Sequence, residues 1–522
     1  MEQKNRILWI DDEIELLRPH IILLEKRDYT VETATNGEDG IELVRQKHFD
    51  LIFLDESMVG LSGLDVLPVL KKIDPSTPII MATKNEAESV MEEAIGSKID
   101  DYLTKPLNPA QIIAVCKKFL DSKRIRSNRL AEEYLQGFNE ISRRLFEPME
   151  WNDWVDVYQK LVSWSMQLDR NPELGFDQTL KDQWRECNAE FSKFVETNYK
   201  RWTRNDKDKD LPLMSSDITK EYLLPLLKSG KPTVFFVVDC MRLDQWLIME
   251  EHLRQYYYFD KKFYSSLLPT ATPYSRNAIF AGLYPSEIKE NYPHLWFNET
   301  NTEEHKANAH EDELLKEQLK RKRIKLNTNL NYIKIHETEF GRRIEKDIVN
   351  ITKSHLTAIV INAVDMIAHS RSDFAILKEI APDESAYRSL TNSWFQHSSL
   401  FGMLKTLSEL DVNILITTDH GSIRCMRGVK VQGDRDTSTN LRYKFGKNVK
   451  AEQRHAMQIR DPLDYKLPSH GITVNNIIAK EDYYFVYPTD FNHYLQKYRD
   501  SFQHGGISME EMIIPVIKLE RK

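Results

Sequence analysis

The sequence predicts an α/β protein in which a doubly wound parallel-sheet domain and a second α/β domain flank an all-α segment. In the first and last parts of the chain, short apolar runs that end in polar residues alternate with stretches of helical spacing, which is the pattern of parallel strands joined by crossover helices. Between these parts the spacing is helical, and glycine and proline are scarce. A length of 522 residues suits about three domains. We therefore expect domains at residues 1–121, 122–228 and 229–522.

The composition is that of a folded cytoplasmic protein. Hydrophobic residues make up 41% of the chain and charged residues 29%, as in soluble globular domains. The net charge of -8 argues against a general nucleic-acid binder. No apolar run approaches the roughly 18 residues that a membrane helix needs, and the first residues lack the apolar core of a signal peptide. The 4 cysteines show no CxxC spacing, so we expect free thiols and no membrane span.

The first 121 residues alternate strictly between strand and helix patterns. Strands are expected where β-branched and apolar residues cluster, and helices where apolar residues recur every three or four positions. The expected strands are 6–12, 29–35, 49–55, 77–83 and 99–104, and the expected helices include 13–28 and 38–48.

Polar side chains follow the ends of these strands. They are three carboxylates, one hydroxyl and one ammonium: Asp11, Asp12, Asp55, Thr83 and Lys105. Carboxylates hold a magnesium ion through oxygen, while an ammonium and a hydroxyl can bind phosphate oxygens. The alternative to such a site is a set of acidic loop residues beside a stabilising lysine. Five suitable side chains at successive strand ends disfavour this alternative.

This segment resembles the receiver domain of response regulators, a flavodoxin-like fold, over its whole length. The resemblance implies that Asp55 accepts a phosphoryl group from a sensor histidine kinase, and that Asp11 and Asp12 help it to bind Mg²⁺. It also implies that Thr83 and Lys105 sense the phosphate and that Tyr102 is the switch aromatic. We expect phosphorylation to produce a homodimer through the face of the fourth helix and fifth strand.

Residues 122–228 predict a helical bundle that is rich in tryptophan. Trp151 and Trp154 are three positions apart and so lie on one helix face; Trp164, Trp184 and Trp202 follow. Aromatic residues at this spacing usually form a core, although a peptide or cofactor groove is an alternative. No helix-turn-helix module with a basic recognition helix is found.

In residues 229–522, several strand patterns lead into potential metal ligands. The expected strands 232–238, 357–365 and 414–421 lead into or contain Asp239, Asp365, Asp419 and His420, with His369 one helical turn after Asp365 and His504 before a last strand at 512–519. Carboxylates and imidazoles at the carboxyl ends of strands suit two divalent metals about 4 Å apart.

A hydroxyl accompanies these ligands in the sequence P-T-A-T-P, which contains Thr272 and Pro273. Proline favours the first helical position and threonine the N-cap, so Thr272 is expected at a helix amino terminus, where anions bind. A simple capping residue and a nucleophile are both consistent with this motif.

This half of the chain resembles the alkaline phosphatase superfamily, in the branch with PglZ-type domains, and P-T-A-T matches the nucleophile motif of its nucleotide phosphodiesterases. The resemblance implies two Zn²⁺ ions. It implies that Asp365, His369 and His504 hold one ion and that Asp239, Thr272, Asp419 and His420 hold the other. It also makes Thr272 the nucleophile. No equivalent of the phosphate-binding arginine of the phosphatases is identified, which favours diesters over monoesters.

Weaker signals lie outside these motifs. The polar loop at 433–440, continuing to Arg442, is a candidate substrate contact through Arg435 or Arg442, although a solvated loop is more typical. The basic run at 316–325 is typical of a solvated helix face, with an anionic substrate or a nucleic acid as the alternative.

The domain order resembles the response regulators of the Bacteroidetes type IX secretion system. This implies control of secretion genes in concert with a sigma factor. Two hypotheses remain open: a phosphorylation-controlled, zinc-dependent phosphodiesterase that acts on nucleotides or oligonucleotides, and a non-catalytic, metal-stabilised regulator that binds a sigma factor or a secretion component.

Overall fold

The computed structural model describes residues 5–84, 99–204, 211–297, 307–373, 375–433, 440–469, 471 and 474–522. The chain forms two compact units, Met1–Gln136 and Gly137–Lys522. The fold class expected from the sequence is confirmed, but the boundary between the units falls inside a helix, and the linker helices belong to the same unit as the C-terminal domain.

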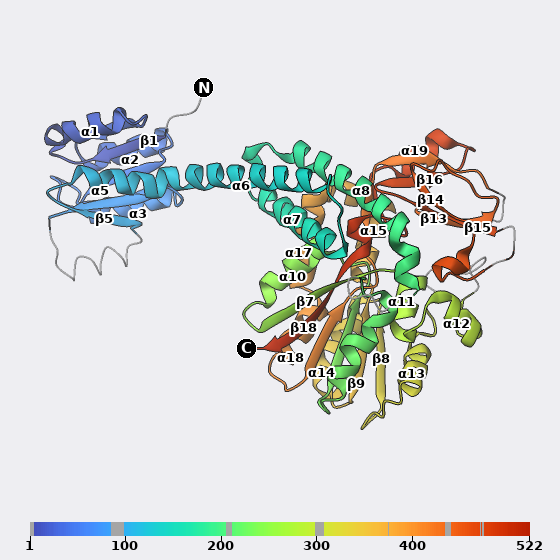
Figure 1. The fold of residues 1–522 in the computed structure, drawn as a ribbon. Helices are drawn as coiled ribbons and strands as arrows, with labels where there is room; N and C mark the ends of the chain where they lie inside the picture. The colour runs from blue at the N-terminus through green and yellow to red at the C-terminus, as the bar shows by residue number, and fades with distance from the viewer. Residues whose placement is uncertain are drawn as a thin grey trace. The chain divides into compact units, whose positions relative to one another are not determined.

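The first unit is a parallel five-stranded sheet with helices on its faces (Figure 1). Its strands are hydrogen-bonded in the order β2-β1-β3-β4-β5: β1 (Arg6–Ile10), β2 (Thr30–Ala34), β3 (Leu51–Asp55), β4 (Ile79–Thr83) and β5 (Asp101–Thr104). Strands β3 and β4 are buried along their whole length, as a central parallel strand requires. Two apolar cores lie on the two faces of the sheet.

Side-chain caps begin three of the helices of this unit. Ser62 caps α3 and forms a reciprocal capping box with Asp65, and Asn36 and Asn108 cap α2 and α5. The helices are η1 (Ile14–Leu17), α1 (Arg18–Glu25), α2 (Gly37–Gln46), α3 (Gly63–Ile73), α5 (Pro109–Cys116), η2 (Lys117–Asp121) and α6 (Ser122–Arg144), which contains the boundary between the units. The expected fourth helix lies outside the described residues.

The tryptophan-rich helices α7 (Trp151–Asp169) and α8 (Asp177–Thr203) pack through aromatic side chains. The ring of Trp154 contacts Phe191 at 5.4 Å between centroids, and the ring of Trp151 contacts Trp202 edge-on at 5.7 Å. All four rings are buried. The expectation that these tryptophans form a core is therefore confirmed for this pair of helices.

A six-stranded mixed sheet forms the centre of the second unit, in the order β7-β18-β10-β6-β9-β8. Strands β10, β6, β9 and β8 are parallel, and β18 runs antiparallel to β10 and β7. Their bounds are β6 (Thr233–Val238), β7 (Tyr257–Ser265), β8 (Leu330–Ile335), β9 (Leu356–Ile361), β10 (Asn413–Thr417) and β18 (Ile513–Arg521).

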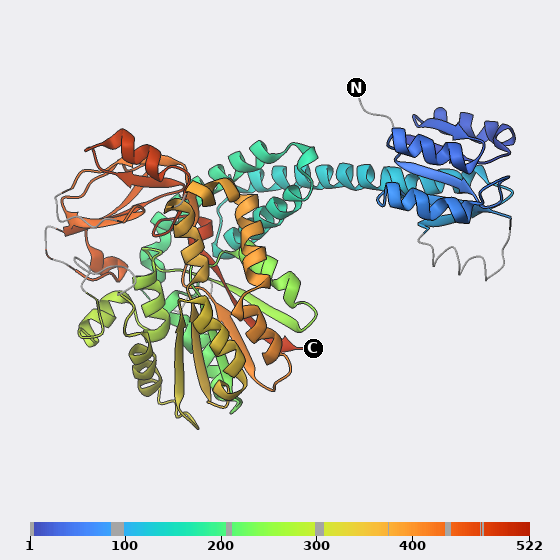
Figure 2. The ribbon, with the colours of Figure 1, turned by 180° about the vertical axis from the view of Figure 1, so that it is seen from behind.

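Helices cover both faces of this sheet, as Figures 1 and 2 show from opposite sides. Helices α10, α14, α17 and α18 contact one another on one face, and α11 and α13 contact each other on the other. The bounds are η3 (Pro172–Leu174), η4 (Ser215–Asp217), η5 (Thr219–Leu223), α9 (Leu224–Leu227), α10 (Leu243–Leu253), α11 (Thr272–Ala281), α12 (Pro285–Asn291), α13 (Glu311–Arg321), α14 (Thr338–Ile351), α15 (Ala363–Asp373), α16 (Ala375–Ile380), α17 (Glu384–Gln396) and α18 (Ser399–Leu407).

Three small sheets lie beyond the main one, paired as β13-β15-β14, β12-β16 and β11-β17. Their elements are β11 (Ile423–Cys425), β12 (Arg427–Lys430), β13 (Tyr443–Lys447), β14 (Ala456–Ile459), η7 (Pro462–Tyr465), β15 (Val474–Ala479), β16 (Tyr483–Val486), α19 (Phe491–Tyr498), β17 (Ser501–Gln503) and α20 (Met509–Met512).

Two local expectations are corrected. Strand β9 ends at Ile361 and Asp365 lies in the first turn of α15, because the chain leaves the sheet at Asn362, whose carbonyl accepts the first helical hydrogen bond from Met366. Thr272 is the first residue of α11 and not its N-cap: Ala271 is the N-cap and no side chain caps the helix.

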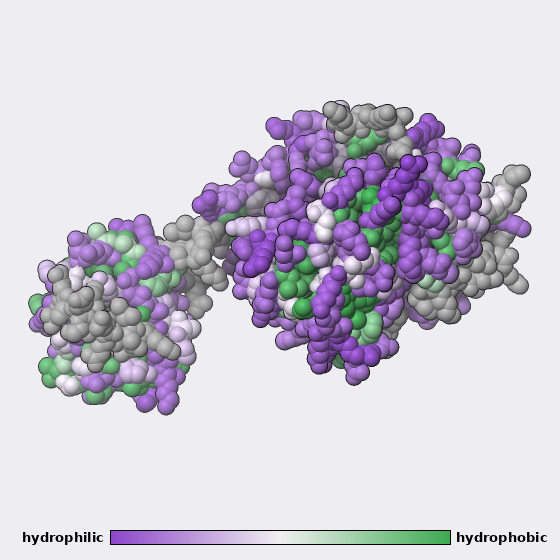
Figure 3. Space-filling view, turned by 90° about the horizontal axis from the view of Figure 1, so that it is seen from below, coloured by the Kyte–Doolittle hydropathy of each residue, from purple (hydrophilic) through white to green (hydrophobic). Residues whose placement is uncertain are grey.

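The surface is mostly hydrophilic with scattered hydrophobic patches in the view of Figure 3. Among the described residues, every helix is too short or too polar to cross a membrane.

Candidate metal and phosphate sites

The receiver unit gathers its acidic residues at the carboxyl ends of β1 and β3. Ligand atoms of Asp11, Asp12 and Asp55 lie within 4.8 Å of one another. The Lys105 ammonium lies 2.9 Å from both Asp11 Oδ2 and Asp55 Oδ1. Burial raises the pKa of Asp55 despite its hydrogen bond from Lys105. Three carboxylates beside one ammonium leave an excess of negative charge that suits Mg²⁺.

The two remaining receiver residues, Thr83 and Tyr102, have other surroundings. The Thr83 hydroxyl donates to the carboxylate of Glu56, a residue that the sequence analysis did not single out. The Tyr102 side chain is 40% exposed. The Thr83 hydroxyl is thus engaged by Glu56, and the Tyr102 ring lies partly in solvent.

In the second unit, the residues predicted as metal ligands come together beyond the carboxyl ends of the parallel strands. Asp239 follows β6, Asp365 and His369 follow β9 on α15, and Asp419 and His420 follow β10. His504 comes from the segment after β17. This is the edge at which open α/β sheets bind their ligands.

One group of ligands consists of Asp365, His369 and His504, whose ligand atoms lie within 4.8 Å of one another. His369 Nε2 lies 3.3 Å from both Asp365 Oδ1 and His504 Nε2. His504 Nδ1 faces the Thr270 carbonyl oxygen at 3.3 Å, which favours the tautomer with the proton on Nδ1 and a lone pair on Nε2.

The second group consists of Asp239, Asp419 and His420. Burial raises the pKa of Asp239 to about 7, with the Arg276 guanidinium opposing the shift, and burial also raises the pKa of Asp419. Burial lowers the pKa of His420, which favours the neutral form of this ring. Its Nδ1 lies 3.0 Å from the Gly421 carbonyl oxygen, which leaves Nε2 as the acceptor. The rings of His420 and His504 stack at 4.3 Å and join the two groups.

The donor set fits two divalent cations. Asp365 Oδ1 and Asp419 Oδ2 are buried and have no hydrogen-bond partner within the described part of the chain. Buried carboxylate oxygens are normally satisfied, and a cation is the partner that their charge requires. Nitrogen and oxygen ligands in equal measure match zinc.

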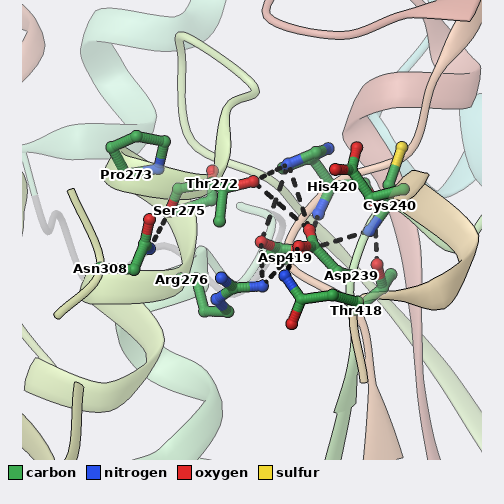
Figure 4. A network of polar contacts seen from close by, with 12 residues as sticks. Asp239, Cys240, Thr272, Pro273, Ser275, Arg276, Asn308, Thr418, Asp419 and His420 are labelled. Atoms are coloured by element: carbon green, nitrogen blue, oxygen red, sulfur yellow. Dashed lines mark hydrogen bonds and ion pairs between the residues drawn. The ribbon is translucent and has the colours of Figure 1, made fainter. Parts of the chain in front are cut away.

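The Thr272 hydroxyl points into the second group, as Figure 4 shows. Its Oγ1 lies 2.9 Å from His420 Nε2 and 3.3 Å from Asp239 Oδ1. Because α11 begins at Thr272 without using its hydroxyl as a cap, the oxygen is available at a helix amino terminus, where unpaired N–H groups favour an anion.

Arg276 is a site residue that the sequence analysis missed. It lies one helical turn after Thr272, and its side chain is 2% exposed. Its Nη1 lies 2.7 Å from Asp239 Oδ2, and its Nε donates to Glu311 at 2.6 Å. A helix that starts at Thr272 places residue 276 on the same face, so the spacing was the signal that could have found it.

Arg276 ends a buried charge network that reaches the mouth of the site. Glu311 also lies 3.4 Å from the Lys334 ammonium and accepts a hydrogen bond from Tyr332. Lys334, Asn308 and Asn362 line a cavity of about 200 Å³ together with Thr272, Arg276, His336 and ligands of both groups.

The two asparagines present unused polar atoms. Asn308 Nδ2 donates to the Thr272 carbonyl oxygen at 3.2 Å, and Asn362 Nδ2 donates to Asp239 Oδ2 at 3.0 Å. The Oδ1 atoms of both are buried without a partner among the described residues. No short motif marks these residues, because they come from segments far from Thr272 in the chain.

Of the two weaker candidates, Arg442 is corrected and Arg435 lies outside the described residues. The Arg442 guanidinium is fully buried, pairs with Glu511 at 2.5 Å and lies against Gly506. It therefore supports the backbone after His504 and is not placed to contact a substrate. In the basic run, Lys316 and Lys320 pair with acids of their own helix, as expected for a solvated face.

Comparisons with known proteins follow the same division of the chain. The family model of the BREX system PglZ alkaline phosphatase-like domain matches residues 218–519, more than half of the chain. The response regulator receiver domain matches residues 7–117 and the PorX response regulator linker domain matches residues 124–203.

Similar curated proteins and solved structures each cover a minor part of this chain. The transcriptional regulatory protein SrrA of Staphylococcus aureus (strain NCTC 8325 / PS 47) is 28% identical over 193 residues, which are 34% of this chain and 77% of SrrA. Chemotaxis protein CheY4 of Vibrio cholerae is 24% identical over 23% of this chain and 100% of its own, with a TM-score of 0.22. A two-component response regulator from Clostridium difficile is 27% identical over 23% of this chain and 98% of its own, with a TM-score of 0.22.

The order of the three matches is that of a PorX-type response regulator, and a receiver domain takes its phosphoryl group from a donor such as a histidine kinase. The chain belongs to the PglZ family of alkaline phosphatase-like proteins, here as a response regulator with a receiver domain and a PorX-type linker before the PglZ domain.

Proposed function

We propose that the PglZ domain is a zinc-dependent phosphodiesterase with Thr272 as its nucleophile. One observation carries the proposal. The Thr272 hydroxyl, 2.9 Å from His420 Nε2 and 3.3 Å from Asp239 Oδ1, is held beside two groups of metal ligands at the amino terminus of α11. A nucleophile needs a neighbouring activating group and a free approach to the reacting atom, and both are present.

In this mechanism, separate residues bind the metals, orient His420 and position Thr272. Asp365, His369 and His504 would hold one zinc ion, and Asp239, Asp419, His420 and Thr272 the other. When bound, the two ions supply Lewis-acid charge at the phosphoryl group and at the attacking hydroxyl. The hydrogen bond of His420 Nδ1 to Gly421 fixes the ring with its lone pair toward Thr272. Asn308 holds the Thr272 backbone in position.

The charges at the mouth of the site favour a phosphodiester over a monoester. Arg276 and Lys334 line the cavity and both pair with Glu311, and Arg276 also pairs with Asp239. Because their charges are already shared with carboxylates, they add little to balance the second negative charge of a monoester. Nucleotides and oligonucleotides are the proposed substrates.

In the same proposal, phosphorylation of Asp55 by a sensor histidine kinase controls this activity through a receiver homodimer. The output is regulation of type IX secretion, together with a sigma factor or a secretion component. This part of the proposal rests on the resemblance of the domain order to the response regulators of the type IX secretion system.

The test is turnover of bis(p-nitrophenyl) phosphate and of p-nitrophenyl phosphate by zinc-loaded full-length protein. Thr272→Ala is expected to lower diester turnover by about 10³-fold or more, as removal of a nucleophile does. The exposed Thr197→Ala is the control. Equal loss in both variants, or faster monoester turnover that needs Thr272, would contradict the proposal. Intact zinc binding without turnover would favour a metal-stabilised binding module.

A further inference from the structure

A second and larger cavity lies inside the PglZ-containing unit, away from Thr272. Its volume is about 430 Å³. One wall is formed by α7 and α8, and the opposite wall by α17, the β11–β12 segment and the start of α10. The cavity takes no part in the proposed hydrolysis, so a ligand bound there is independent of the proposed function.

The wall on α7 and α8 is apolar and carries an oriented indole. Trp184 Nε1 donates to Ser165 Oγ at 3.1 Å, and the indole packs edge-on against Tyr158 at 5.9 Å. The apolar residues of this wall are Tyr158, Val162, Leu168, Leu180 and Trp184. The satisfied indole N–H and the aliphatic neighbours make a surface for an apolar or aromatic body.

The opposite wall is charged, but its arginines are already neutralised. Arg242 pairs with Asp244 at 2.6 Å and with Glu384 at 2.7 Å. Arg388 pairs with Asp169 at 2.7 Å and also reaches Asp244 at 3.2 Å. Arginines held between carboxylates offer little to an anionic ligand, because their charge and their donors are engaged.

Similar pairing holds at the two other arginines of this wall. Arg427 pairs with Glu481 at 2.6 Å and also with Asp482, and Arg424 pairs with Asp500. The remaining basic side chains, Lys181 and Arg185, are exposed at the rim, where water and salt screen them.

Glu510 is a carboxylate of this cavity that is held by an amide and not by a cation. Asn188 Nδ2 donates to its Oε2 at 3.0 Å, and Asn188 is itself oriented by accepting the Met509 N–H at 2.9 Å. No described lysine, arginine or histidine lies within ion-pair distance of Glu510, and the nearby Arg242 is held by Asp244 and Glu384. Burial raises the pKa of Glu510 to about 7. A desolvated carboxylate of this kind is stabilised by a cation that enters the cavity.

We propose that this cavity binds a small organic cation, an amine on an apolar or aromatic body, with the ammonium against Glu510 and the body against Trp184. The cavity size suits one such molecule. The face of the Trp184 indole also attracts the ammonium group through a cation–π interaction when the two are in contact.

The main chain of Glu510 lies against Gly421, the residue that follows the candidate metal ligand His420. The Glu510 carbonyl oxygen is so close to Gly421 that a Cβ at that glycine would lie 1.9 Å from it, and the Gly421 N–H donates to the Glu511 carbonyl oxygen at 3.1 Å. Gly421 follows His420, whose Nδ1 faces the Gly421 carbonyl oxygen. The main chain at Gly421 therefore connects the cavity wall at Glu510 with His420.

The experiment is calorimetric titration of full-length protein with tryptamine, with indole-3-propionate as the matched probe in which a carboxylate replaces the ammonium. Tryptamine is expected to bind at one site per chain, and indole-3-propionate about tenfold or more weakly, since a charge-assisted pair is replaced by repulsion. Equal binding of the two probes, or no binding of tryptamine, would overturn the proposal. This comparison uses the wild-type protein alone.

Three variants place the site. Glu510→Gln should weaken tryptamine about tenfold, Val162→Phe should block it by filling the cavity, and Glu520→Gln should bind as the wild type does, because Glu520 is an exposed acid on β18. Tryptamine binding that is unchanged in Glu510→Gln and in Val162→Phe, each checked for folding by circular dichroism, would place the amine elsewhere and refute the assignment.

Discussion

His369 Nε2 and His504 Nε2 face each other at 3.3 Å, although the two residues are 135 positions apart in the chain. His504 Nδ1 faces a carbonyl oxygen, so its Nε2 carries a lone pair. Asp365 Oδ1 lies 3.3 Å from His369 Nε2 and 3.7 Å from His504 Nε2. The two nitrogens and this oxygen therefore surround a position that suits a metal cation.

The first prediction is that His504→Ala loses one of two bound zinc ions. Without His504, this metal site keeps only Asp365 and His369 as ligands. Its metal affinity should therefore fall by at least about 10-fold. The measurement is zinc per chain by elemental analysis after dialysis. His294→Ala is the control, because His294 is an exposed imidazole away from the ligands. Full zinc content in His504→Ala would contradict the assignment.

Arg276→Met should destabilise the metal-free PglZ-containing unit by about 3–5 kcal/mol, because it leaves Asp239 and Glu311 buried without their shared cation. Added zinc should recover part of this loss, since a metal neutralises Asp239 but does not reach Glu311. Urea unfolding in the presence of a chelator and of zinc measures both effects. Arg454→Met, with a side chain 76% exposed, should change the free energy of unfolding by less than about 1 kcal/mol. Similar losses in both variants would rule out a special role for the buried network.

Glu510 should make stability fall as the pH rises from about 4.5 to about 7. Its pKa is raised by burial from 4.5 to about 7 in the folded protein. The folded state then binds more protons than the unfolded state in this window, so the free energy of unfolding decreases with pH. The loss of stability is complete above the folded pKa and absent below the unfolded pKa, with a size of about 1–3 kcal/mol.

Chemical unfolding across this range should show a shallower pH slope in Glu510→Gln than in the wild type. Glu520→Gln, which removes an exposed acid paired with Lys518, should keep the wild-type slope. A slope that is identical in all three proteins would show that Glu510 titrates normally.

The last prediction concerns the receiver. Beryllofluoride with Mg²⁺ at Asp55 adds an anion beside Lys105, which lies 2.9 Å from Asp55 Oδ1, and should draw Thr83 away from Glu56 and Tyr102 inward. We expect the molar mass from light scattering to double. Asp55→Ala should remain a monomer under the same conditions, and Asp50→Ala, another carboxyl beside β3, should dimerise. A wild-type chain that stays monomeric at saturating beryllofluoride would rule out dimerisation as the switch.

The receiver strands, the strands β6, β10 and β18, and the candidate metal ligands were predictable from local patterns in the sequence. Short apolar and β-branched runs such as 233–238 and 414–417 favour buried strands, and the carboxyl ends of parallel strands share one edge of a sheet. Asp239, Asp419 and His420 stand directly after such runs, so their meeting follows from local patterns and one rule of topology.

Only the tertiary structure decided which residues complete the sites. Arg276, Glu311 and Lys334 form one charge network, but they come from separate elements, and no period in the sequence relates them. Arg442 follows a polar loop and was therefore a candidate substrate contact. Its packing against Gly506 and its ion pair with Glu511 make it a core residue instead. The physical reason is that burial and pairing of charged side chains depend on contacts between distant segments, whereas periodicity reports only on which face of its own element a residue lies.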